Sequence, residues 1–234
     1  MVDLVHEFEN RFSAHRLTRS QKQIRLLVVR PLCEGDTVTC NIQVCSLSAD
    51  DQSEYEAVLY SWHHVTGARM VIIDGKEGQI PAAAEEALRH LRHTEQPRVL
   101  WIDTVCINQR KLEDRSHQVA LMHLVYKKAL RVLAWLEQSN DSTPEMIRTL
   151  DLIHDHVNKE TNNGLRLREV LYGPANIFQY SHSPLPERCD FDLMRQFFRR
   201  KWFHRLWVVQ EAALSLDLCG AYTMPLLRMM RTAV

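Results

Sequence analysis

Polar side chains follow a mostly apolar segment near the middle of the chain, and their chemistry suits ligand binding. Residues 98–102 have the composition of a buried strand, and Asp103, Asn108 and Gln109 come soon after it. In an open α/β sheet, ligands bind in the crevice beyond the carboxyl ends of the strands. A carboxylate and two amides placed there could contact the ribose or amide of a nucleotide. Equally, they could cap the next helix and satisfy loop backbone groups, and the sequence leaves both interpretations open.

A second polar group ends the predicted strand over residues 55–62. Ser61 and Trp62 would lie beside the same crevice if the two strands are neighbours. The indole of Trp62 could stack on a base or a nicotinamide ring, or it could pack against the sheet. These two residues complete the set of candidate ligand contacts.

Composition narrows the class of protein. Of 234 residues, 45% are hydrophobic and 25% are charged, which is typical of a globular protein with a real core. Lys+Arg and Asp+Glu both number 29, so binding of nucleic acid through bulk charge is not expected. No apolar run reaches the roughly 18 residues that cross a bilayer, and no secretory signal opens the chain. An intracellular, cytoplasmic protein without membrane contact is therefore expected.

The cysteines and histidines do not form a metal motif. The six cysteines include no C-x-x-C pair and no zinc-type spacing, and H-E-x-x-H is absent. Buried, reduced cysteines and no metal site are the expectation.

Periodicity predicts the elements that must position the candidate residues. Strands are expected at 24–29 and 38–44, joined as an antiparallel pair, and at 55–62, 70–73, 98–102 and 131–136. Helices are expected from Pro81, over 113–130, from Ser142 to Val157 and over 202–211. The helix over 113–130 is expected to bury one stripe, consisting of Val119, Met122, Val125, Tyr126 and Ala129. One more strand could begin within 216–219.

Strands and helices alternate across 70–136, which predicts an α/β fold with a mainly parallel central sheet flanked by helices on both faces. The antiparallel pair is expected at one edge of that sheet. An N-terminal arm over 1–23 precedes the domain at 24–220, within which 158–190 is a loop-rich insertion. The tail at 221–234 is short and stops without a closing signal, as expected of a truncated product.

Four sequence blocks together resemble the heterokaryon incompatibility (HET) domain of filamentous fungi. They are Tyr55-Glu56-Ala57 with Tyr60 and Trp62; Leu100-Trp101-Ile102-Asp103 with Cys106-Ile107-Asn108-Gln109; Arg115 with Gln118-Val119, Met122, Tyr126 and Ala129; and Trp202-Phe203 with Arg205, Trp207-Val208 and Gln210-Glu211. The blocks occur in the family's order over roughly residues 24–220. Membership implies a signalling module in fungal non-self recognition that triggers programmed cell death through protein partners or self-association.

The same resemblance extends to Toll/interleukin-1 receptor (TIR) domains, because HET domains are regarded as their distant relatives. It implies a flavodoxin-like sheet and, as an alternative function, cleavage of NAD with release of nicotinamide. Such a reaction needs a carboxylate beside the ribose, where an oxocarbenium-like centre forms. Glu113, at the early helix position that the acid has in TIR enzymes, is the first candidate, and Asp114 is its substitute. The simpler interpretation is that both acids favour the helix dipole. A paralogue that keeps only the fold is a third possibility.

Overall fold

A mixed sheet of eight strands forms the centre of the molecule. The computed structural model describes residues 12–31, 37–48, 54–60, 67–135, 190–199 and 218–220, together with 145–146, 148–149, 151–152 and 155. The described strands are β1 (Gln23–Val29), β2 (Thr39–Ser46), β3 (Glu56–Tyr60), β4 (Ala68–Ile73), β5 (Lys76–Pro81), β6 (Arg98–Trp101), β7 (Arg131–Trp135) and β8 (Leu218–Gly220). The helices are the 3-10 turn η1 (Arg19–Gln21), α2 (Ala82–Leu91), α3 (Asp103–Cys106), α4 (Leu112–Lys128) and α7 (Phe191–Phe198).

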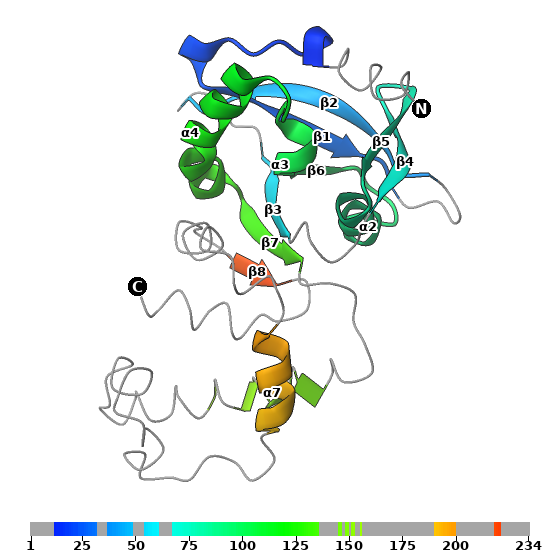
Figure 1. Cartoon of the computed structure of the whole chain (residues 1–234), viewed down its shortest axis with the longest axis vertical. Helices are drawn as coiled ribbons and strands as arrows, with labels where there is room; N and C mark the ends of the chain where they lie inside the picture. Colours follow the sequence, from blue (N-terminus) through cyan, green and yellow to red (C-terminus); the bar gives the residue numbers. More distant parts are fainter. Residues whose placement is uncertain are drawn as a thin grey trace.

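The strand order is β5-β4-β2-β1-β6-β3-β7-β8 (Figure 1). The last four strands in this order run parallel to one another. In the other half, β1 is antiparallel to both β2 and β6, and β4 pairs antiparallel with β5 and parallel with β2. The α/β class is therefore confirmed, with a sheet that is mixed.

The predicted antiparallel pair exists as β1 and β2, with Gln23 opposite Ser46 and Val29 opposite Cys40. Its expected position at the edge of the sheet is wrong, because β1 and β2 lie in the interior between β4 and β6. The physical reason is burial on both faces: Ile24, Leu26 and Leu27 are all fully buried. A strand buried on both sides belongs inside a sheet.

A hairpin that the sequence analysis recognised only in part forms the outer edge beyond β2. Asp74 and Gly75 have positive φ angles of 52° and 75°, and Ile73 pairs with Lys76 across this two-residue loop. Asp-Gly with two positive φ angles is typical of a type I′ turn, whose twist suits a hairpin. The first strand of the hairpin was predicted at 70–73, but its second strand, β5, was not.

Helices cover both faces of the parallel half. Arg98 and Trp101 lie three residues apart in β6, so their side chains point to opposite faces. The Arg98 guanidinium donates to the carbonyl of Leu91 at the end of α2, at 2.6 Å. The indole of Trp101 meets the ring of Tyr126 in α4 edge to face, with 5.6 Å between the ring centroids. The chain therefore places α2 on one face and α4 on the other (Figure 1).

The buried stripe of α4 differs from the prediction at one position. Val125, Tyr126 and Ala129 are buried as expected, but Val119 is 48% exposed. The buried side chain in that turn is Gln118, whose amide donates to the carbonyl of Gln23 at 2.9 Å. A polar residue on the inner face hides the helical period from a pattern based on hydrophobicity.

Ion pairs with a single carboxylate connect the amino ends of three parallel strands. Glu56 begins β3, Arg98 begins β6 and Arg131 begins β7. Both guanidinium groups bond the Glu56 carboxylate: Arg98 in a bidentate manner and Arg131 through Nε at 2.9 Å. Glu56 is only 7% exposed, so these bonds compensate the cost of burying its charge.

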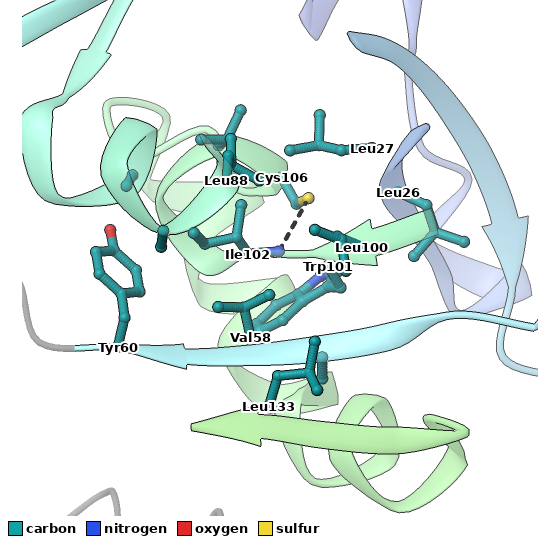
Figure 2. Packing of buried hydrophobic residues seen from close by; sticks show 14 of the residues in the cluster. Leu26, Leu27, Val58, Tyr60, Leu88, Leu100, Trp101, Ile102, Cys106 and Leu133 are labelled. Carbon is teal, nitrogen blue, oxygen red and sulfur yellow. Dashed lines mark hydrogen bonds between the residues drawn. The ribbon is translucent and has the colours of Figure 1, made fainter. Parts of the chain in front are cut away.

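Two further predictions concern side chains of the buried core. Trp101 is fully buried between β6 and α4, as expected, and Figure 2 shows it among Val58, Leu100 and Ile102. Cys40, Cys45 and Cys106 are buried free thiols, which agrees with their prediction as small hydrophobes. The predicted helix over 202–211 and residues 158–189 of the predicted insertion lie outside the described residues.

Replacement of Trp101 by alanine tests the core assignment. Truncating a fully buried aromatic side chain removes its packing and leaves a cavity, so Trp101→Ala should lower the free energy of unfolding by about 3–5 kcal/mol. Val119→Ala on the exposed face of α4 is the control and should change it by less than about 0.5 kcal/mol. Denaturant unfolding followed by fluorescence and circular dichroism measures both. Equal effects of the two substitutions would contradict the assignment.

Candidate functional site

The topology creates a switch point between β3 and β7. These strands are parallel neighbours, yet the chain continues from β3 to strands on one side of the pair and from β7 to β8 on the other. Connections that leave in opposite directions open a crevice at the carboxyl ends of the strands, where α/β proteins bind ligands. Asp103, Asn108 and Gln109 all follow β6 at this edge. Ser61 and Trp62, which follow β3, lie outside the described residues.

Hydrogen bonds of Asp103 and Thr104 connect the end of β6 to the end of β3. The Asp103 carboxylate accepts bonds from the backbone nitrogen of Thr104 at 2.7 Å and from the Thr104 hydroxyl at 3.2 Å. The Thr104 hydroxyl also bonds the hydroxyl of Tyr60, the last residue of β3. Tyr60 and Thr104 are both buried. Sequence reasoning did not single out Thr104, and only its place directly after Asp103 could have indicated it.

Asn108 and Gln109 bond backbone groups of the loop between α3 and α4. The Asn108 side-chain oxygen accepts from the backbone nitrogens of Arg110 at 3.1 Å and Lys111 at 3.2 Å. The Gln109 amide donates to the carbonyl of Asp103 at 3.1 Å. These contacts fix the loop that leads into α4, as the capping interpretation expects. A ligand role for either side chain stays a prediction.

The cysteine that ends α3 is unreactive. Cys106 is 1% exposed, and its sulfur accepts a bond from the backbone nitrogen of Ile102 at 3.4 Å (Figure 2). Burial raises the pKa of the Cys106 thiol to about 12, and the hydrogen bond and the nearby Arg25 only partly oppose the shift. The group is a neutral thiol at pH 7, and the thiolate is the nucleophilic form. Cys106 is therefore a packing residue.

The two acids of the predicted pair have different environments. Glu113 is exposed in the first turn of α4. The Asp114 side chain is only 14% exposed, and both of its oxygens accept hydrogen bonds. Arg25 donates to them through Nη1 at 3.1 Å and Nη2 at 3.2 Å, and the backbone nitrogen of Asn108 adds a third bond at 3.0 Å. Asp114 thus anchors the start of α4 to β1.

Arg25 is a second residue that sequence reasoning missed. Its side chain is 3% exposed, and besides Asp114 it donates to the carbonyls of His15 at 2.9 Å and Cys106 at 3.2 Å. The ring of Phe12 lies 4.8 Å from the guanidinium carbon, in a cation–π contact. One signal was available: a lone arginine inside the apolar run 24–29 must find a partner if the strand is buried.

An open pocket of about 270 Å³ lies against this ion pair. The N-terminal arm, the start of β1 and the loop and first turns around α4 line it, with Phe12, Ser13, Arg16, Leu17, Arg25, Asn108, Lys111, Asp114 and His117. Of the predicted site residues, the pocket brings together Asn108 and Asp114. The side chains of Asp103, Gln109 and Glu113 are not part of its lining.

Neither a metal-binding cluster nor a membrane-spanning helix occurs in the described part of the chain. Within the described ranges, no group of three or more histidine, cysteine, aspartate or glutamate residues is placed to hold a metal ion. Among the helices of those ranges, none has both the length and the apolar character needed to cross a membrane.

Comparisons with known proteins agree on one family. The family model described as "Heterokaryon incompatibility protein (HET)" matches residues 55–211, which is more than half of the chain. "Heterokaryon incompatibility protein 6, OR allele" of Neurospora crassa is 27% identical over 227 residues, covering 86% of this chain. The match covers 33% of the Neurospora protein, so the chain spans about a third of the length of this relative. No solved structure is significantly similar.

Removal of the Asp114 charge tests the anchoring ion pair. Asp114→Asn keeps the shape of the side chain but leaves Arg25 buried without a counter-charge, so the free energy of unfolding should fall by about 3 kcal/mol. Glu113→Gln, the same chemical change one residue earlier on the exposed face, should alter it by less than about 0.5 kcal/mol. Denaturant midpoints of the two variants against the wild type give the comparison. A loss for Glu113→Gln as large as that for Asp114→Asn would contradict the assignment of the anchor.

Proposed function

The chain belongs to the heterokaryon incompatibility (HET) family, and from this premise we propose that it is a signalling module of fungal non-self recognition that promotes cell death. The observation that carries the proposal is the family match over residues 55–211. The similarity to the Neurospora protein over 86% of this chain supports it. Because only a third of that relative is matched, the proposal concerns the part of such a protein that this chain represents.

We further propose that the module acts inside the cell through self-association or a protein partner. Leu112 and Val119 support this part of the proposal, because they are 64% and 48% exposed on α4. Residues seven apart lie on the same side of a helix. Two exposed apolar side chains on one helix face suit contact with another protein surface better than contact with water.

Regulated expression in a filamentous fungus tests the proposed function. Induction of the wild-type chain should arrest growth and kill hyphal compartments, seen as uptake of a dye that living cells exclude. Trp101→Ala should abolish killing because it removes the folded state that delivers the signal, whereas Lys127→Gln, an exposed change in the last turn of α4, should leave killing intact. Normal growth of hyphae that accumulate the wild-type chain would overturn the proposal.

A second candidate function is hydrolysis of NAD at its N-glycosidic bond. The switch point between β3 and β7 favours it, because such a position is where α/β folds bind nucleotides. The four parallel strands with helices on both faces also support a flavodoxin- or TIR-like relationship, although the antiparallel β1 inside the sheet departs from that plan. Water would add to the anomeric carbon of the ribose as nicotinamide departs, yielding ADP-ribose, nicotinamide and a proton.

Glu113 is the carboxylate proposed for this reaction, because Asp114 is already held by Arg25. A negative charge beside the ribose would stabilise the oxocarbenium-like transition state. The proposed ligand contacts remain Ser61, Trp62, Asp103, Asn108 and Gln109.

Incubation of the purified chain with NAD distinguishes the two functions. If the enzyme function is correct, the wild type should release nicotinamide and Glu113→Gln should be at least about 100-fold slower, the scale of losing one electrostatic group in an active site. Lys127→Gln should keep the full rate. Chromatography of nicotinamide and ADP-ribose measures turnover. No release at high protein concentration, together with killing in hyphae, would exclude the enzyme and leave the signalling function in place.

A further inference from the structure

We propose that the pocket between the N-terminal arm and the start of α4 binds the phosphate group of a small ligand. Of the nine residues that line this pocket, only Asn108 is among the ligand contacts proposed for NAD in the preceding subsection. Four of its lining residues belong to the segment 12–17 and a fifth is Arg25 in β1, so more than half of the lining precedes the family match at 55–211. The inference therefore stands independently of the family assignment.

Charge is the first argument. The lining contains three permanently cationic side chains, Arg16, Arg25 and Lys111, but a single carboxylate, Asp114. An excess of positive charge concentrated in a concave surface attracts anions.

The carboxylate cannot neutralise this excess. Both oxygens of Asp114 accept hydrogen bonds from Arg25, and one also accepts from the backbone of Asn108. Arg25 and Asp114 thus compensate each other within a closely bonded pair. The charges of Arg16 and Lys111 remain for a ligand, because neither has an ion-pair partner among the residues that the structure describes.

The available hydrogen-bonding groups are the second argument. Arg16, Lys111 and Ser13 can all donate, and a phosphate group offers three acceptor oxygens. The side-chain oxygen of Asn108 is occupied by two backbone nitrogens, whereas its amide nitrogen makes no bond within the described part of the chain. Asn108 can therefore add a neutral donor beside the cations.

The position of the pocket at the amino end of α4 adds to these two arguments. Lys111 is the N-cap of a helix of 17 residues. The partial positive charge at a helix amino end favours a negative group nearby. This partial charge stabilises the carboxylate of Asp114 in the first turn of α4. It would also stabilise a phosphate bound at Lys111.

Size and shape determine the class of ligand. A volume of about 270 Å³ lies near the lower end of small-molecule sites, which suits a phosphate or a short phosphate ester better than an extended polymer. Phe12 and Leu17 supply the apolar part of the lining. Because the arm provides one wall, a bound phosphate would join Arg16 of the arm to Lys111 of the α4 loop.

Calorimetric titration of the full chain tests the inference with three probes: inorganic phosphate, ribose 5-phosphate and ribose, all at constant ionic strength. Phosphate or ribose 5-phosphate should bind with saturation, whereas ribose should not. Tighter binding of ribose 5-phosphate identifies a phosphate ester as the ligand, and equal binding of both phosphates identifies the free ion. In the variant Arg16→Gln/Lys111→Gln the dissociation constant should rise by about 100-fold, roughly tenfold for each charge-assisted hydrogen bond that the substitutions remove.

Lys127→Gln provides the matched control. It removes one positive charge from the exposed surface of the same helix, about 24 Å along the axis from Lys111 at 1.5 Å per residue, and should leave binding unchanged. Arg16 and Lys111 are exposed, so the double variant should unfold at the wild-type temperature without ligand. Absence of saturable binding up to about 10 mM, beyond the millimolar range of weak sites, would overturn the proposal. So would equal binding by the double variant, or binding of ribose as tight as that of its phosphate.

Discussion

The shared carboxylate of Glu56 is the constraint on which the parallel half of the sheet depends. Burying this charge is tolerable only because Arg98 and Arg131 both reach it, and each arginine is the first residue of a strand that flanks β3. The ion cluster therefore holds β3 between β6 and β7. That placement separates β6 from β7, its successor in the chain, and so creates the switch point at the opposite ends of the strands.

A second buried ion pair connects elements of the fold at the carboxyl edge of the sheet. Arg25 and Asp114 connect β1 to the start of α4, and Arg25 also bonds the carbonyls of His15 and Cys106. The guanidinium of Arg25 thus connects the N-terminal arm and the segment after β6 to the sheet. The pocket owes its shape to this convergence, and its surplus charge arises because the pair is already neutralised internally.

The sequence predicted elements better than their arrangement. Apolar runs and helical periods located β1, β6, α2, α4 and β7, because local pattern determines such segments. Strand order depends on contacts that local pattern does not contain, such as Arg98 and Arg131 meeting Glu56. Some information was nevertheless present: unbroken apolarity over 24–29 indicates an interior strand, and Asp74-Gly75 indicates a hairpin. The polar content of β5 concealed the second strand of that hairpin.

The candidate site could likewise be predicted only in part from the sequence. Asp103, Asn108 and Gln109 were located at the end of β6 from their position after an apolar run, and their hydrogen bonds depend largely on the loop that contains them. The distinction between Glu113 and Asp114 could not come from sequence, since helix geometry gives both the same dipole and only Arg25, 89 residues from Asp114, separates their roles. The pocket likewise combines segments far apart in the chain.

The separation of the Glu56 cluster along the chain has a consequence for how the polypeptide acquires its fold. Arg98 lies 42 residues after Glu56, and Arg131 follows later still. Pairing over such distances must first overcome the entropy of closing long loops, which slows folding. During synthesis on the ribosome, β3 therefore leaves the exit tunnel as an apolar strand without neighbours on either side. It stays exposed to chaperones, or to other nascent chains, until β7 has been translated.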